Sequence, residues 1–191
     1  MTNQGKLTLK PQTLESANPR AKAVLEQAQA QIGFIPNMYA AMVNSPGLLQ
    51  TYLDGYAAFR THSGFSPVEQ EVVFLTISRE NGCDYCTSAH SMIADKMSKV
   101  PADILRALRS GEPIPNAKLA VLSTFTSQLF ATRGRPTTAN LQAFLDAGFD
   151  ERQVLEIVLA LAVKTLSNYS NHLNRPKLDA AFAAYAWTPR A

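Results

Sequence analysis

Both cysteines of the chain, Cys83 and Cys86, lie in one short stretch together with one of its three histidines, His90. If a helix begins at about Asp84, the offsets of three, four and seven residues place these three side chains on one face. Two thiols close enough to form a disulfide, with an imidazole one turn away, are typical of a redox site. The stretch therefore indicates thiol chemistry, in which a thiolate attacks a peroxide or a disulfide.

The residues around the thiols suggest how a proton could be handled. The start of a helix favours the thiolate, because unpaired amides and the helix dipole lower a thiol pKa there. His90, one turn after Cys86, can take the thiol proton directly or through a water. Glu71 and Glu80 lie upstream, and a helix hairpin at residues 81–82 could bring one of them near His90. Such a carboxylate would fix the histidine tautomer or relay its proton.

The same residue types allow other interpretations. Two thiols and an imidazole at this spacing could hold zinc, with His172 or His62 as a fourth ligand. The thiols could also be buried and inert, or could form a non-catalytic redox sensor or disulfide oxidoreductase module. A glutamate in the first turn of a helix is often only a dipole partner, which is the alternative for Glu71. Glu80 could simply end a solvated helix, and His172 could be a hydrogen-bonded packing residue.

Signals for the start and end of helices divide the rest of the chain. Asn18 followed by Pro19 predicts one helix start, Ser66 and Glu69 form a capping box at a second, and Asp150 marks a third. No segment alternates with period two between turn residues, so we expect no strand, which argues against a thioredoxin fold. The sequence predicts an all-α domain of nine to ten helices over residues 18–191, after a loose arm at 1–17. Helices are expected near residues 21–31, 36–43, 48–59, 67–79, 101–109, 117–131, 137–147 and 178–187. Two more are expected, one beginning at about residue 84 and one beginning at Asp150 with its apolar part over 154–163.

Composition narrows the possible partners. The net charge is only +3 and is scattered, which argues against a nucleic-acid partner. No run is apolar enough for a signal peptide or a membrane span, so a cytoplasmic protein is expected. Charged residues make up 17% of the chain, below the usual quarter, and residues 154–163 are apolar on nearly every side. Such a helix is expected in the middle of a core or in the interface of a homo-oligomer.

Several segments together resemble a known family. They are residues 33–38 (GFIPNM), 44–49 (NSPGLL), 66–71, 78–90 with the Cys-x-x-Cys-x-x-x-His signature, and 168–172. The chain resembles the alkylhydroperoxidase D-like members of the carboxymuconolactone decarboxylase superfamily, and in particular their peroxidase-related branch. Because these segments span most of the chain, the resemblance implies one all-helical domain that assembles as a trimer or a hexamer.

The resemblance also implies a function and its residues. It implies a thiol-dependent hydroperoxide reductase that needs an external thiol or dithiol reductant and no bound cofactor. Cys86 matches the cysteine that attacks the peroxide, and Cys83 the cysteine that then closes the redox-active disulfide. His90 and Glu71 match the proton relay. Tyr85 stands where the best-studied members have a second histidine, and because tyrosine is a poor proton acceptor, it is expected only to support the relay.

Overall fold

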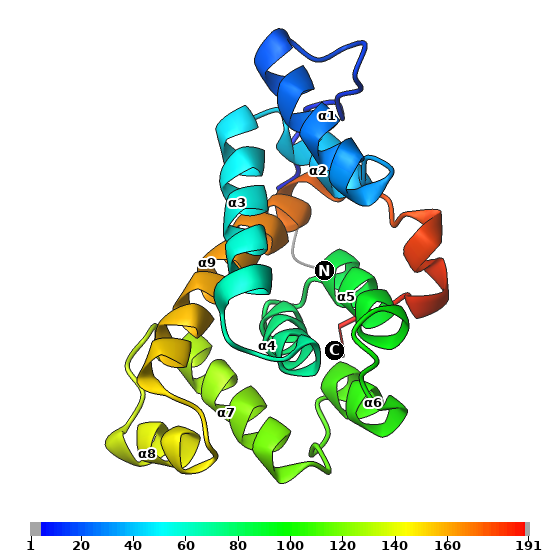
Figure 1. Cartoon of the computed structure of the whole chain (residues 1–191). Helices are drawn as coiled ribbons and strands as arrows, with labels where there is room; N and C mark the ends of the chain where they lie inside the picture. The colour runs from blue at the N-terminus through cyan, green and yellow to red at the C-terminus, as the bar shows by residue number, and fades with distance from the viewer. Residues whose placement is uncertain (1–4, 190–191) are drawn as a thin grey trace.

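The computed structural model of the chain describes residues 5–189 (Figure 1). This part contains nine α-helices, one 3₁₀ helix and no strand, so the predicted all-α class is confirmed. The elements are α1 (Pro19–Ile32), α2 (Asn37–Met42), α3 (Pro46–His62), α4 (Pro67–Glu80), α5 (Asp84–Lys96), α6 (Ala102–Ser110), α7 (Ala117–Ala131), α8 (Thr138–Asp146), α9 (Glu151–Asn174) and η1 (Ala180–Tyr185).

Helix α4 passes through the middle of the molecule. The predicted capping box starts it, with the Ser66 hydroxyl accepting from the Glu69 amide at 3.3 Å and the Glu69 carboxylate accepting from the Ser66 amide at 2.8 Å. Every residue from 69 to 78 is buried, and the helix packs against α5, α7 and α9. A polar side chain in this stretch, such as that of Glu71, therefore lies in the interior and needs partners there.

A tight turn joins α4 to α5. Gly82 has a φ of 64°, in the left-handed region that glycine adopts without steric cost. The Cys83 amide donates to the Ser78 carbonyl at 2.9 Å, which closes the turn. Helix α5 then begins at Asp84, as the sequence predicts, with Cys83 as its N-cap residue. Both cysteines therefore lie at the start of α5, which packs against α4 and α9.

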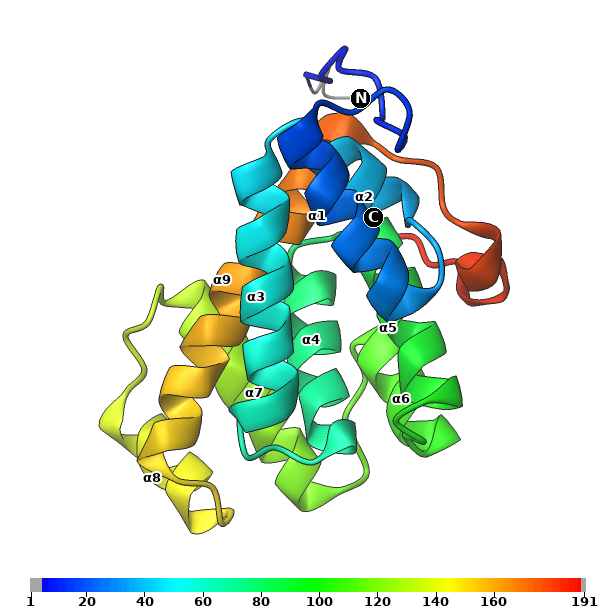
Figure 2. The ribbon, with the colours of Figure 1, turned by 45° about the horizontal axis from the view of Figure 1, so that its top comes forward.

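Helix α9 differs from the prediction in length. The expected helix over 154–163 and the polar segment after it form one helix of 24 residues. It runs alongside α3 (Figure 2). Ile157 and Val163 face the core, whereas Leu155 is 70% exposed and Val158 is 46% exposed. One face of the apolar segment therefore lies outside the core of the single chain, and the alternative, an oligomer interface, stays a prediction. Within the described part, no helix, including α9, is long and apolar enough to cross a membrane.

The segment before α1 was expected to be a loose arm over residues 1–17, of which 1–4 lie outside the described residues. From residue 5 it contains no helix, but it is fixed by backbone hydrogen bonds. The Leu7 amide donates to the Leu173 carbonyl at 3.0 Å, and the Gln12 amide donates to the Ala40 carbonyl at 2.8 Å. The described part of the arm therefore lies against α2 and the end of α9.

The segment after α9 covers α5. The helix expected over 178–187 is the shorter 3₁₀ helix η1, which packs against α5. Beyond it, the Trp187 amide donates to the Ser88 hydroxyl at 3.0 Å, and the Trp187 indole donates to the Arg109 carbonyl at 2.8 Å. The end of the described chain is thus attached to α5 and α6, and Figure 1 shows η1 beside α5.

Candidate active site

The two thiols are free and buried at the start of α5. Cys83 is 0% exposed and Cys86 is 2% exposed. The side-chain amide of Asn171 on α9 donates to both sulfurs, at 3.6 Å to Cys83 and 3.3 Å to Cys86. The Ser167 hydroxyl oxygen, one turn earlier on α9, lies 3.8 Å from the Cys86 sulfur. The dithiol is thus held between the first turn of α5 and one face of α9.

A chain of hydrogen bonds connects His90 to side chains on α4 and α3. His90 Nδ1 lies 2.9 Å from the Glu71 carboxylate, and the other oxygen of that carboxylate binds the Arg60 guanidinium. Arg60 also donates to the Tyr56 hydroxyl at 2.7 Å. Glu71 is fully buried, and it contacts His90 as the sequence predicts. Arg60 is an additional partner of Glu71 that sequence reasoning missed. Glu80 lies outside this group, on the surface with Arg79 and Ser127.

The environment sets the protonation states of Glu71 and His90. Burial alone would raise the pKa of Glu71, but His90 and Arg60 lower it below its ordinary value. Burial lowers the pKa of His90 to about 4, with a further contribution from Lys164, against the raising effect of Glu71. At neutral pH, Glu71 is therefore a carboxylate and His90 a neutral imidazole. Because a carboxylate can only accept, Nδ1 of His90 carries the proton and Nε2 is left free to accept one.

The pKa values of the two thiols are shifted in opposite directions. Burial would raise the pKa of Cys86, but hydrogen bonding to Cys83, the charge of Lys164, and polar contacts with Ser167 and Asn168 lower it to about 5. The hydrogen bond to Cys86 raises the pKa of Cys83, and burial raises it further. Cys86 is therefore the more acidic thiol of the pair, and Cys83 is the thiol that donates a hydrogen bond to it.

An apolar cavity of about 380 Å³ opens beside Cys86 and His90. Most of the residues in its wall are aromatic or aliphatic. Helices α2, α3 and α5 supply most of the lining, and η1 closes one side. Besides Cys86 and His90, the wall includes Phe34, Met38, Tyr39, Tyr52, Tyr56, Tyr85, Met92, Ile93 and Phe182. The cavity can therefore hold an apolar molecule in contact with the sulfur and the imidazole.

Tyr85 lies in this wall but not in the relay. Its hydroxyl donates to the carboxylate of Asp179 and accepts from the Met38 amide at 3.4 Å. Burial and Asp179 both raise its pKa. The Tyr85 hydroxyl donates its proton to Asp179 and not to Glu71 or His90, so the structure does not place Tyr85 with the residues that it was expected to support. Tyr85 instead fixes the segment before η1 against α5, and its ring packs edge-on against Phe182 at 6.0 Å.

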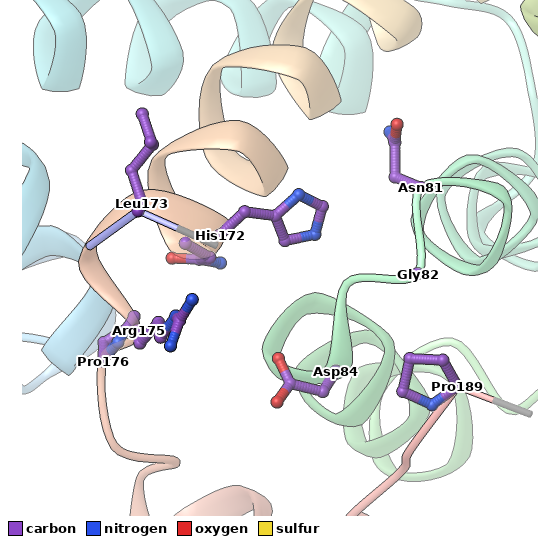
Figure 3. A pocket seen from close by; sticks show the side chains of 10 residues that line it. Asn81, Gly82, Asp84, His172, Leu173, Arg175, Pro176 and Pro189 are labelled. Atoms are coloured by element: carbon purple, nitrogen blue, oxygen red, sulfur yellow. The ribbon is translucent and has the colours of Figure 1, made fainter. Parts of the chain in front are cut away.

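A second, more polar hollow of about 820 Å³ lies on the other side of the turn between α4 and α5. Figure 3 shows His172 and Arg175 from the end of α9 on one wall, and Asn81 and Asp84 on the other. His172 is half-buried here and stacks on the Tyr169 ring at 6.3 Å. It belongs to this hollow and does not border the cavity at Cys86.

The zinc interpretation lacks a ligand set. Among residues 5–189, no three His, Cys, Asp or Glu side chains are grouped as a metal ion would require. His62, one of the two proposed fourth ligands, ends α3, where its carbonyl accepts from Arg152 at 3.0 Å. The other, His172, lies in the hollow described above.

The polar residues of α9 were missing from the predicted site. Ser167, Asn168 and Asn171 are buried, and so is Lys164. Their spacing of three, four and seven residues from Lys164 places all four on one face, which was the signal in the sequence. Residues 168–172 contributed to the family resemblance, but no role for Asn168 or Asn171 followed from them. For Arg60 no local pattern exists, because its contact with Glu71 depends on how α3 packs against α4.

Comparison with known proteins supports the family. Residues 46–123 match the model of the carboxymuconolactone decarboxylase family, and this range holds Glu71, both cysteines and His90. A protein described as an alkylhydroperoxidase AhpD core and an uncharacterized peroxidase-related protein, from Ralstonia eutropha JMP134, superposes with a TM-score of 0.80 at 19% identity, over 95% of this chain and 97% of that one. Both findings support the predicted relationship to the alkylhydroperoxidase D-like members of this family. The chain has an AhpD-like fold, and no curated protein matches its sequence significantly.

Two further structures share the AhpD-like fold over nearly their full length. An uncharacterized peroxidase-related protein from Silicibacter sp. TM1040 has a TM-score of 0.73 at 19% identity, covering 94% of this chain and 97% of that one. The debrominase Bmp8, as a cysteine-to-alanine variant in complex with 2,3,4-tribromopyrrole, has a TM-score of 0.75 at 17% identity, covering 94% of this chain and 96% of that one. At these identities the similarity establishes the fold alone. The proteins that share it include peroxidase-related proteins and a debrominase.

Proposed function

We propose that the protein is a thiol-dependent hydroperoxide reductase in which Cys86 attacks the peroxide and Cys83 resolves the product. The observation that carries the proposal is the position of Cys86. Its sulfur borders an apolar cavity, and the pKa of the thiol is lowered to about 5 even though it is buried. A reactive thiolate beside a cavity, with a second thiol within the same turn, is what this reaction requires.

The first step forms a sulfur–oxygen bond. The Cys86 thiolate attacks the terminal oxygen of the hydroperoxide, and the O–O bond breaks with its electron pair leaving on the alkoxide. Cys86 becomes a sulfenic acid that keeps the terminal oxygen and its hydrogen. The alkoxide takes up one proton and leaves as the alcohol. His90 is placed to relay this proton, because Glu71 holds Nδ1–H and leaves Nε2 free.

The second step closes the disulfide. The Cys83 sulfur attacks the sulfenic sulfur of Cys86, and the leaving hydroxide combines with the Cys83 thiol proton to give water. Once the Cys86 thiolate has been oxidised, the interaction that most raises the pKa of Cys83 is gone, so the resolving thiol is activated at the right moment. An external thiol or dithiol then supplies two electrons and two protons, which restores the pair without a bound cofactor.

The test is the consumption of cumene hydroperoxide and of hydrogen peroxide with dithiothreitol as the reductant. Cys86→Ser should abolish turnover. In the absence of dithiothreitol, Cys83→Ser should consume one equivalent of hydroperoxide and leave a sulfenic acid at Cys86 that dimedone traps, whereas the wild type should form the disulfide. Glu80→Gln, on the surface, is the matched control and should keep wild-type rates. Retained turnover in Cys86→Ser would refute the proposal. One equivalent of oxidation without turnover in the wild type would identify the pair as a redox sensor instead.

A second candidate, reductive dehalogenation, is favoured by the similarity to the debrominase Bmp8 and by the aromatic wall of the cavity. The Cys86 thiolate would attack the bromine of a bromopyrrole, the ring carbon would take a proton, and Cys83 would displace bromide to form the disulfide. Overall, one aryl bromide and two thiols give the arene, a disulfide and hydrogen bromide. Bromide release from 2,3,4-tribromopyrrole with dithiothreitol, faster than peroxide consumption, would favour this reaction over the first.

We also propose that the chain assembles as a homo-oligomer, a trimer or a hexamer. Its support is the outer face of α9, where large apolar side chains lie along one stripe. Their exposures are 70% for Leu155, 46% for Val158, 53% for Tyr169 and 48% for Leu173. Light scattering of the wild type tests this proposal.

A further inference from the structure

Lys164 is a fully buried lysine with no hydrogen-bond partner. It is 0% exposed, and among the described residues no donor, acceptor or carboxylate hydrogen-bonds to its Nζ. Lysine is almost never fully buried unless it is paired, because an ammonium ion loses much hydration energy in the interior. A lysine that is charged in such a position needs an anion near it.

The side chain of Lys164 lies within the site. Its Nζ is 5.6 Å from the centre of the Phe74 ring, which in turn lies 4.9 Å from the His90 ring and 4.9 Å from the Arg60 guanidinium carbon. One turn further along α9, Ser167 lies 3.8 Å from the Cys86 sulfur. Lys164 therefore belongs to the same buried face of α9 that contacts the dithiol.

Of the acidic groups around the two cysteines within residues 5–189, only Cys86 is available as an anion for Lys164. The carboxylate of Glu71 already binds both Arg60 and His90, and no ion pair joins it to Lys164. Asp179 accepts from Tyr85. The remaining groups that face the site from α2, α3 and α5 are neutral at pH 7, apart from Cys86. They are the tyrosines Tyr39, Tyr52, Tyr56 and Tyr85, the thiol of Cys83, and the imidazole of His90.

We propose that Lys164 is the counter-ion of the Cys86 thiolate and acts as a positioning residue for the reactive sulfur. The charges of the site then balance. Arg60 is neutralised by Glu71, and Lys164 by Cys86, so the buried group as a whole is neutral when Cys86 is a thiolate. With Cys86 as a thiol, the same interior carries one uncompensated positive charge.

This pairing changes the part that His90 plays. Lys164 is among the causes that lower the pKa of Cys86, and it also lowers the pKa of His90. One cation therefore favours both the thiolate and the neutral imidazole at pH 7. His90 is not needed to deprotonate Cys86 before the reaction, and it is left for the proton of the departing alkoxide. Only this last role rests on the proposed peroxidase function, because the ion pair exists without a substrate.

The first test is the pH dependence of Cys86 alkylation by iodoacetamide, followed by the ultraviolet absorbance of the thiolate. In Lys164→Met, which keeps the length and loses the charge, the thiol pKa should rise by about 1 to 3 relative to the wild type. Lys118→Met is the control, because Lys118 pairs with Glu69 at the surface. An unchanged pKa in Lys164→Met, or an ordinary thiol pKa in the wild type, would overturn the proposal. No peroxide is added, so the measured thiol pKa does not depend on whether the protein reduces peroxides.

The second test needs no variant, so it stands even if Lys164→Met does not fold. In wild-type protein, the ammonium resonance of Lys164 is recorded by NMR with the pair reduced and with the pair oxidised to the disulfide. Oxidation removes the thiolate charge, so the Lys164 resonance should move while that of Lys118 stays in place. Identical Lys164 resonances in the two states would overturn the proposal.

Discussion

Removing the Glu71 carboxylate tests whether the buried group of Arg60, Glu71 and His90 is held together by charge. The carboxylate is fully buried and accepts from two partners, Arg60 and His90, whose side chains are 19% and 4% exposed. In Glu71→Ala both partners lose their acceptor, and the guanidinium keeps its charge inside the protein. Truncating one member of a buried ion pair costs about 3 to 5 kcal/mol of unfolding free energy.

The structure places the expected cost near the lower end of that range. Arg60 keeps hydrogen bonds to the Tyr56 hydroxyl at 2.7 Å and to the Gln70 side chain at 3.1 Å, and it is not completely buried. We therefore expect a loss of about 3 kcal/mol, which for a chain of this length lowers Tm by roughly 6 to 12 °C. In Glu71→Gln the volume is kept, but the amide donates to His90 Nδ1. The imidazole proton then moves to Nε2 and the free acceptor is lost.

The assay is denaturant unfolding of both variants beside the surface control Glu80→Ala, together with ¹⁵N NMR of His90 for the tautomer. The pair of Glu80 with Arg79 is partly exposed, so its loss should cost less than about 1 kcal/mol. Folding lowers the pKa of Glu71, so its contribution is complete above its ordinary value of 4.5 and is lost as the pH falls through the folded value. A Glu71→Ala variant as stable as Glu80→Ala at pH 7, or an unchanged tautomer in Glu71→Gln, would refute the reasoning.

Three further predictions follow from other features. Folding lowers the pKa of His90 from 6.5 to about 4, so the wild type should lose about 3 kcal/mol of unfolding free energy from that group as the pH falls between these values. The loss should be absent in His90→Phe. Unfolding free energies that depend equally on pH in the two proteins would contradict this. Gly55→Ala should destabilise by about 1 to 3 kcal/mol, because its Cβ would lie 2.8 Å from a Val163 methyl, whereas Gly47→Ala, in open space, should not. Leu155→Lys should dissociate the proposed oligomer in light scattering, and a monomeric wild type would contradict that proposal.

The parts of the fold that depend on local chemistry could be predicted from the sequence. The starts of α1, α4 and α9 follow from capping residues that act on amides two or three positions away, at Asn18, Ser66 and Asp150. The register of Cys86 and His90 follows from the helical repeat alone. These signals need no knowledge of what packs against the helix, so they hold in the folded protein.

The parts that depend on packing could not be predicted. The polar half of α9 was separated from its apolar half, because polar residues normally face solvent. Here Ser167 and Asn171 lie in the interior and find partners there. The Asn171 amide donates to the two sulfurs, and the Ser167 hydroxyl donates to the Val163 and Lys164 carbonyls of its own helix. The Arg60–Glu71 pair likewise joins residues 11 positions apart on two helices, and nothing local distinguishes Arg60 from a surface arginine.

The site is divided between two regions of the chain. The segment at 46–123 that matches the family model contains both cysteines, Glu71 and His90, whereas α9 lies outside that segment and supplies groups that contact the sulfurs. Substitutions in α9 can therefore change the reactivity of the thiol during evolution while the Cys-x-x-Cys-x-x-x-His signature stays the same. Two proteins with identical signatures can then differ in chemistry, and a comparison of their last long helices would reveal the difference before a comparison of their motifs.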